Sequence, residues 1–156
     1  MAVKSFQGAR AQKAQTKAPH LLVKDIMCQN LVVFHPDQSI HEVMQNFVKY
    51  RISGGPVVND AGKLIGVISE ADCMKEISES RYFNMPILDK SVRNFMTVSV
   101  DTIEASKSLF EAASLFSKSS RRRYPVMERG KLVGQISRKD VVLAALNLKS
   151  STWRRS

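Results

Sequence analysis

The sequence carries the same pattern twice, and this repeat constrains the fold more than any single motif. Residues 23–27 match residues 92–96 at an offset of 69 positions, and Pro56-Val57 matches Pro125-Val126 at the same offset. One residue is then lost in a glycine-containing turn, after which the offset is 68. A hairpin turn tolerates such a change. We therefore expect two similar units within one small domain.

Each unit predicts the element order β-α-β-β-α, so the fold class is a mixed α/β (α+β) arrangement of tandem repeats. In the first copy, Pro36 ends a short extended segment, Ser39 is a typical helix cap, and Pro56 stands at the permitted first position of a strand. Apolar residues recur at helical spacing after Ser39. The expected helices lie near 39–48, 70–78, 108–118 and 138–148, and the expected strands near 31–34, 56–58, 64–68, 124–127 and 131–136.

The net charge of +10 is concentrated toward the ends of the chain. Residues 1–20 are rich in Ala, Gln and Lys and predict a basic flexible tail, and residues 149–156 predict a basic C-terminal tail. Tail charge of this kind usually reflects solvation or loose attraction to polyanions. Nucleic-acid binding is only a minor hypothesis, because aromatic residues make up 7% of the chain and no nucleic-acid-reading motif is present.

The composition argues against several other classes of protein. No apolar run approaches the roughly 20 residues of a membrane span, and the N-terminus has no apolar signal region. Cys28 and Cys73 make neither a disulfide framework nor a metal-binding set, which fits a cytoplasmic protein. There is no P-loop and no Ser-His or Cys-His arrangement with an orienting acid, so we expect no catalysis and no metal site.

Residues 79–91 join the first copy, residues 21–78, to the second, residues 92–148. This linker contains Tyr82, Phe83, Met85, Ile87 and Leu88, and is too apolar to stay free in water. We expect it to pack along one face of the molecule or against a second chain, and the sequence leaves both possibilities open.

Four segments together resemble the CBS domain pair, or Bateman module, over residues 21–148. They are Ile-Ser-Gly-Gly-Pro-Val-Val at 52–58, Arg-Arg-Arg-Tyr-Pro-Val at 121–126, and Gly-x-Ile-Ser-x-x-Asp at 66–72 and 134–140. The resemblance implies a pseudo-twofold pair with two clefts that commonly bind adenine nucleotides or adenosyl compounds, such as AMP, ADP, ATP or S-adenosylmethionine. It also implies that modules often form homodimers shaped like a flat disc.

The Ser-x-x-Asp pairs, Ser69 with Asp72 and Ser137 with Asp140, have two readings. The ordinary one is a capping box, in which the serine caps a helix and the aspartate bonds back to the serine amide. The functional one, implied by the resemblance, is ribose binding: an ionised carboxylate can accept charge-assisted hydrogen bonds from both hydroxyls of a sugar diol. The two roles can alternate, with ligand displacing the internal bonds.

The resemblance also implies positions for adenine and phosphate. The adenine slot is expected at Val33, Phe34, Gly55, Pro56, Val57, Thr102, Ile103, Tyr124, Pro125 and Val126, and plain core packing is the alternative for all of them. Phosphate is expected at the second-copy arginines Arg121, Arg122 and Arg123, where extended backbone would alternate their directions, and arginine suits phosphate through its planar fork. A solvated charge run is the alternative. Arg51 is the nearest cation in the first copy, so we expect unequal sites.

The leading functional hypothesis is a regulatory module. It would hold an adenine nucleotide or adenosyl ligand, without a covalent cofactor, and would transmit a conformational change to an unidentified protein partner. The alternative is a dimerisation or interaction module whose clefts take no ligand, and the apolar linker motivates it. Polyanion binding by the basic tails is the third reading.

Overall fold

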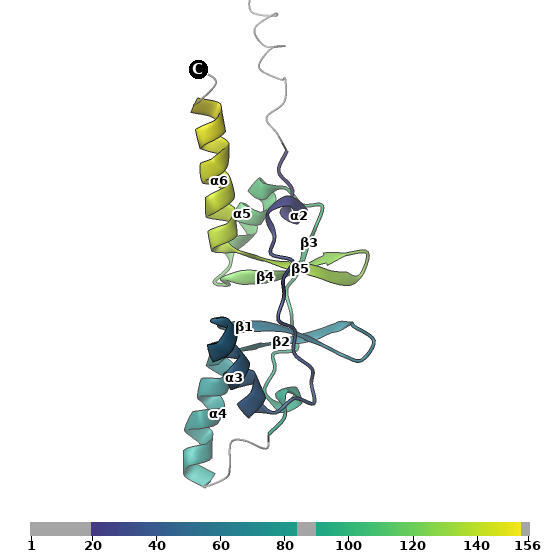
Figure 1. Ribbon diagram of the computed structural model, residues 1–156, viewed down its shortest axis with the longest axis vertical. Helices are drawn as coiled ribbons and strands as arrows, with labels where there is room; N and C mark the ends of the chain where they lie inside the picture. Colours follow the sequence, from purple (N-terminus) through teal and green to yellow (C-terminus); the bar gives the residue numbers. More distant parts are fainter. Residues whose placement is uncertain (1–19, 84–89, 154–156) are drawn as a thin grey trace, which may run out of the picture.

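The computed structural model describes residues 20–83 and 90–153, which form two bodies stacked along the long axis of the molecule (Figure 1). Body 1 contains α3 (Ile40–Tyr50), β1 (Gly54–Val58), β2 (Leu64–Ser69) and α4 (Glu70–Phe83). Body 2 contains β3 (Ile103–Glu104), α5 (Leu109–Lys118), β4 (Arg123–Glu128), β5 (Lys131–Ser137) and α6 (Arg138–Trp153). The α-β-β-α order is therefore the same in both bodies, as the repeat predicts.

The first strand of each unit is shorter than expected. In body 2 it is the two-residue β3, which pairs in parallel with β4. In body 1 the expected strand at 31–34 is reduced to one bridge, in which the Phe34 amide donates to the Pro56 carbonyl and the Val58 amide donates to the Phe34 carbonyl. The chain turns at once through Pro36, which has no amide hydrogen to extend a ladder. The prediction was right in position and too long in extent.

The two helices that close the repeats run further than predicted. The first was expected to end near Ser78, and α4 instead continues to Phe83, because the intervening residues include no glycine or proline to stop it. The segment predicted as a linker from residue 79 therefore begins as helix. The residues that follow, 84–89, lie outside the described residues, and so does the predicted packing of Met85, Ile87 and Leu88.

Two straps cross between the bodies, so that each repeat begins on the other body. The N-terminal strap, residues 21–28, includes α2 (Val23–Ile26), and the inter-repeat strap, residues 90–97, includes the 3-10 turn η2 (Val92–Asn94). Val23 donates its amide to the Lys107 carbonyl and is buried in the core of body 2. Val92 donates its amide to the Gln38 carbonyl and is buried in the core of body 1. The sequence predicted neither this exchange nor the two short helical turns.

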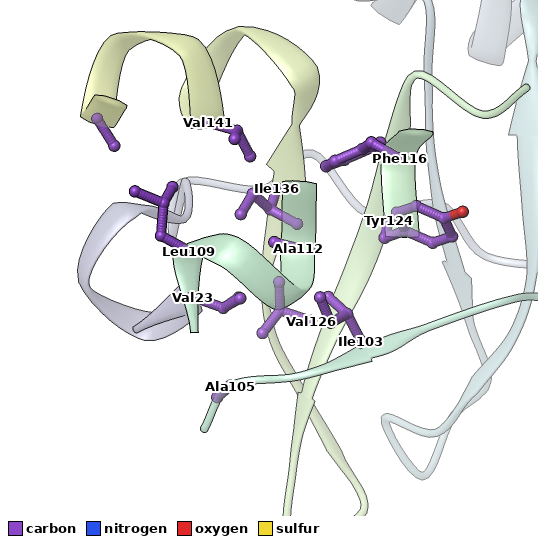
Figure 2. Packing of buried hydrophobic residues seen from close by; sticks show 11 residues of the cluster. Val23, Ile103, Ala105, Leu109, Ala112, Phe116, Tyr124, Val126, Ile136 and Val141 are labelled. Atoms are coloured by element: carbon purple, nitrogen blue, oxygen red, sulfur yellow. The ribbon is translucent and has the colours of Figure 1, made fainter. Parts of the chain in front are cut away.

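Each body has its own apolar core between its helices and its small sheet. In body 1, Phe34 meets Phe47 edge to face, with ring centroids 5.6 Å apart. In body 2, Phe116 packs against Tyr124 with centroids 5.0 Å apart, and Figure 2 shows these rings at one end of the cluster. Figure 2 also shows Val23 of the N-terminal strap among the side chains of α5 and β4. The straps therefore complete the cores rather than lying outside them.

The start of α3 confirms the predicted cap. The Ser39 hydroxyl oxygen accepts a hydrogen bond from the Glu42 amide at 3.1 Å. Ser108 does the same for the Glu111 amide at the start of α5, and the Glu111 carboxylate accepts from the Ser108 amide at 2.8 Å. In the described ranges, no helix has the length and apolar character needed to cross a lipid bilayer.

Candidate functional site

Both Ser-x-x-Asp pairs sit where the second strand of a hairpin passes directly into a helix. At the body 1 corner, the Asp72 carboxylate oxygen Oδ2 accepts from the Ser69 amide at 2.9 Å and from the Ser69 hydroxyl at 2.9 Å. At the body 2 corner, Asp140 Oδ2 accepts from the Ser137 amide at 2.8 Å and from its hydroxyl at 2.9 Å. Each aspartate amide donates back to its serine hydroxyl. The capping-box geometry is therefore present in both corners.

The straps fix the strands that lead into these corners. Thr97 of the inter-repeat strap exchanges both backbone hydrogen bonds with Val67, at 2.9 and 3.0 Å. The backbone approaches so closely here that a Cβ atom on Gly66 would lie 2.9 Å from the Thr97 carbonyl oxygen. Gly134 is in the same position against Cys28 of the N-terminal strap. Each corner is thus held by residues from the other repeat.

A pocket of about 500 Å³ opens between the two bodies at the Ser69 corner. Body 1 contributes Ser69, Asp72 and the backbone around Gly54. The chain entering body 2 contributes Thr97, Val100 and Asp101, and the start of β4 contributes the three arginines and Pro125. A pocket of this size is within the range of small-molecule sites. Its lining combines the body 1 acids Glu70 and Asp72 with the three arginines, next to which lies Asp101.

The predicted ribose residues divide between the two corners. Ser69 and Asp72 line this pocket, and both are half-buried. Ser137 and Asp140 belong to the other corner and do not line it. The local geometry of the two corners is nearly the same, so the difference between the sites comes from what faces each corner and not from the motif.

The predicted adenine residues mostly fill the cores. Only Gly55 and Pro125 among them line the pocket. The side chains that are instead buried, at 5% exposure or less, are Phe34, Pro56, Val57, Ile103, Tyr124 and Val126. Five of these six belong to the apolar cores of the two bodies, and the exception is Pro56, which adjoins Val57 in β1 and so faces the other side of the strand. Val33 is 45% exposed, and Thr102 lines neighbouring hollows on body 2.

The three arginines all line the pocket, and the alternation expected of their side chains stays a prediction. β4 begins at Arg123, and the two preceding arginines are not in a strand. Arg121 pairs through Nε with the Asp101 carboxylate at 2.8 Å. Arg123 donates from Nη2 to the Ser53 hydroxyl oxygen and from Nη1 to the Gly54 carbonyl oxygen at 3.4 Å. Arg122 is exposed.

The remaining cation expected at a phosphate, Arg51, lies outside this pocket. It caps the C-terminal end of α3 in the left-handed conformation, with φ of 54°, and its side chain is exposed. Sequence reasoning missed Asp101. One signal was available: Asp101 is the repeat counterpart of the apolar Val32, and a charge in place of an apolar residue marks a position where the two copies differ in environment. In the described ranges, no three His, Cys, Asp or Glu side chains are grouped to hold a metal ion.

The CBS domain family model matches this chain at residues 23–79 and 92–147. The chain therefore belongs to the CBS domain family and contains two copies of the domain. It is 31% identical to the uncharacterized protein MJ1426 of Methanocaldococcus jannaschii, in a match that covers 81% of this chain and 92% of that protein. It is 30% identical to the chloroplastic CBS domain-containing protein CBSX2 of Arabidopsis thaliana, across 80% of this chain and 62% of that protein's length.

Two solved structures with this fold contain adenosyl compounds. The crystal structure of CBSX2 in complex with AMP matches with a TM-score of 0.73 and 34% identity, over 83% of this chain and 98% of that one. The CBS domain pair of protein MJ0100, in complex with 5′-methylthioadenosine and S-adenosyl-L-methionine, matches with a TM-score of 0.67 and 27% identity, over 83% of this chain and 98% of that one.

Proposed function

We propose that this protein is a regulatory sensor that binds an adenine nucleotide or adenosyl compound in the pocket between its bodies. One observation carries the proposal: the Ser69 and Asp72 corner of body 1 faces three arginines of body 2 across a pocket of about 500 Å³. A carboxylate suits a ribose diol, and arginines suit a phosphate. The two relatives crystallised with adenosyl compounds support the same ligand class.

The Asp72 carboxylate can serve the helix and a ribose together. Both of its hydrogen bonds to Ser69 fall on Oδ2. An ionised carboxylate has two oxygens and about four acceptor sites, so Oδ1 can receive ribose hydroxyls while the cap remains intact. The ligand then gains a charge-assisted contact without the loss of a helix cap. Ser69, Asp72 and the backbone of Gly55 and Pro125 are the residues that we assign to the nucleoside.

Ligand binding in this pocket regulates by changing how the two bodies sit together. The pocket walls come from both bodies, so an occupant contacts both. A ligand shifts a conformational equilibrium by its difference in affinity for the two states, and a partner protein that recognises one state would read that shift. We assign no catalytic role and no covalent cofactor to the chain, and we propose that it works in the cytoplasm.

We also propose that the protein forms a homodimer through the outer faces of α4 and α6. These helices run along the same side of the molecule (Figure 1). Their outward apolar side chains are Met74, Val142, Leu143 and Leu146, with exposed fractions from 49% to 58%. Light scattering of the wild type and of Val142→Glu tests this: we expect the dimer mass for the first and the monomer mass for the second.

Calorimetric titration tests the proposed function. The full chain is titrated with AMP, ADP, ATP, adenosine, 5′-methylthioadenosine and S-adenosylmethionine, with GMP as the control for the base. We expect at least one adenine ligand to bind in the micromolar range and GMP to bind more weakly. The proposal fails if no adenine ligand binds at millimolar concentration to a chain that circular dichroism shows to be folded.

A further inference from the structure

The pocket between the bodies contains acids for which the proposed ribose and phosphate contacts give no complete account. Among the described residues, the charged side chains that line it are Glu70, Asp72, Asp101, Arg121, Arg122 and Arg123. The three negative and three positive formal charges cancel. Asp72 has the proposed ribose role, so Glu70 and Asp101 are the acids still to be explained. Each of them weakens the attraction of the pocket for any anion, and both therefore bear on which ligands the pocket accepts.

Asp101 engages one of the three arginines. Its carboxylate oxygen Oδ2 lies 2.8 Å from Nε of Arg121. Within the described ranges, no ion pair joins a carboxylate to Arg122 or Arg123. Two arginines therefore remain for a ligand, and their combined charge matches the charge of about −2 on one phosphate monoester. A second or third phosphate would meet an Arg121 whose charge Asp101 already compensates.

Glu70 lies beside the contact that Arg123 makes with body 1. The Glu70 amide donates to the Ser53 carbonyl oxygen at 2.9 Å, and the Arg123 guanidinium donates to the Ser53 hydroxyl oxygen. Glu70 also follows Ser69 directly, at the start of α4, and it is exposed. Its negative charge is therefore close to any phosphate chain that leads from a ribose on Asp72 toward the arginines.

The two acids are not part of what the repeat conserves between its copies. The counterpart of Glu70, 68 positions later, is Arg138, and the counterpart of Asp101, 69 positions earlier, is Val32. The capping bonds between Ser137 and Asp140 form with an arginine in the place of Glu70. The cap therefore does not need an acid at this position, and the charge of Glu70 is a property of the pocket.

We propose that Glu70 and Asp101 make this pocket selective for adenosyl ligands with at most one phosphate, so that it binds AMP more tightly than ADP or ATP. The inference rests on the proposed function, because it needs an adenosyl ligand in the pocket. Both acids act through their charge: Asp101 compensates Arg121, and Glu70 repels additional phosphates. In a mixture of adenine nucleotides, the module would then respond to the monophosphate with little competition from ATP.

Titration calorimetry of the full chain with adenosine, AMP and ATP tests this selectivity, with EDTA present so that no divalent cation masks the charge of ATP. The variants are Glu70→Gln, Asp101→Asn and the matched control Glu128→Gln, which changes an exposed acid at the end of β4, outside the pocket lining. In the wild type we expect AMP to bind at least about ten-fold more tightly than ATP. Each pocket variant should tighten ATP about three- to ten-fold and AMP by less, because ATP carries more charge. Adenosine should change by less than about two-fold, and the control should leave all three affinities near the wild-type values.

Two further measurements check that charge is the cause. Glu70→Arg should tighten ATP more than Glu70→Gln does, and these two variants keep the test decisive if Asp101→Asn does not fold. Raising the salt concentration from about 0.05 M to about 0.5 M should reduce the difference between the wild type and Glu70→Gln, because salt screens exposed charges. ATP affinity that stays the same or falls in Glu70→Gln, or in a folded Asp101→Asn protein, overturns the proposal. An equal gain for adenosine overturns it too, because adenosine carries no charge for the acid to repel.

The outcomes separate this inference from the proposed function. ATP binding to the wild type as tightly as AMP, or more tightly, leaves the adenosyl site standing and overturns the selectivity. Absence of binding by adenosine, AMP and ATP at millimolar concentration overturns the inference. The proposed function fails with it if 5′-methylthioadenosine and S-adenosylmethionine also do not bind.

Discussion

The Glu76 carboxylate of α4 is wholly buried and contacts the ammonium of Lys90, at the start of the inter-repeat strap. Neither carboxylate oxygen has a well-directed hydrogen bond within the described residues, so this ion pair is the compensation for the buried charge. Its counterpart position in the second copy is Ala144, which is buried in the core of body 2. The same position of the repeat therefore holds a charged side chain with an ion-pair partner in body 1 and a small apolar side chain in body 2.

Replacing one member of this ion pair should lower the stability of the protein strongly, whereas replacing both members should not. Lys90→Met leaves an unpaired buried carboxylate, and we expect a loss of about 3–5 kcal/mol in the free energy of unfolding. Glu76→Leu combined with Lys90→Met should return the stability to near the wild-type value, because apolar replacement of a buried ion pair is often neutral. Urea unfolding measures both. A double variant as unstable as the single one would contradict this account.

The close contact between strap and strand predicts the effect of Gly66→Ala. The new Cβ would meet the Thr97 carbonyl oxygen and the Met96 sulfur, each at 2.9 Å. We expect a loss of about 1–3 kcal/mol, as for other overpacked sites, and a similar loss for Gly134→Ala. Adding Met96→Ala to Gly66→Ala should not restore stability, because the backbone carbonyl remains. Recovery in that double variant, measured by thermal unfolding, would show that the backbone contact is unimportant.

The Cys73 thiol should not react with alkylating reagents in the folded protein. Burial, with smaller contributions from the charges of Asp72 and Glu70, raises the pKa of its thiol to about 11. The thiolate is the reactive species, so iodoacetamide at pH 8 should label the exposed Cys28 and leave Cys73 unmodified until the protein is unfolded. Peptide mass spectrometry reads out both sites. Equal labelling of the two in the folded state would contradict the burial.

The same pKa gives the direction of a pH effect. Because the folded pKa lies above the ordinary value for a cysteine, the stability contributed by the neutral thiol is complete below that ordinary value. It is lost as the pH rises from there through about 11. Cys73→Ala should flatten this part of the stability profile, measured by urea unfolding between pH 8 and pH 11. An unchanged profile in that variant would assign the alkaline loss to other groups.

Local patterns in the sequence were enough to predict the repeat, the helix caps and the strand-to-helix corners. Ser39 and Ser69 indicate helix starts because each makes its capping hydrogen bonds with a residue only three positions away. The exchange of the straps could not be predicted this way, because Val23 finds its partners more than 80 positions later. The hydrophobicity of a residue predicts that it is buried, but it does not indicate which of the two cores contains it.

The residues of the pocket could also be predicted only in part from the sequence. The family resemblance implied site roles for Asp72 and for the arginines that begin at Arg121, but it could not separate pocket residues from core residues in an apolar strand. The family resemblance implied that Phe34 and Val57 line the adenine slot, with core packing as the alternative, and both side chains are buried in body 1. Asp101 belongs to no motif, and only the path of the chain between the bodies brings it to Arg121.

The central claim is that the Ser69 and Asp72 corner, and not its repeat at Asp140, holds the nucleotide ribose. Asp72→Ala and Asp140→Ala are matched variants, because each aspartate makes the same capping bonds, so each should cost about 0.5–2 kcal/mol of stability. Titration of both with AMP separates binding from folding. We expect Asp72→Ala to weaken AMP by at least about ten-fold and Asp140→Ala to leave it near the wild-type value. Full AMP affinity in a folded Asp72→Ala protein would contradict the claim.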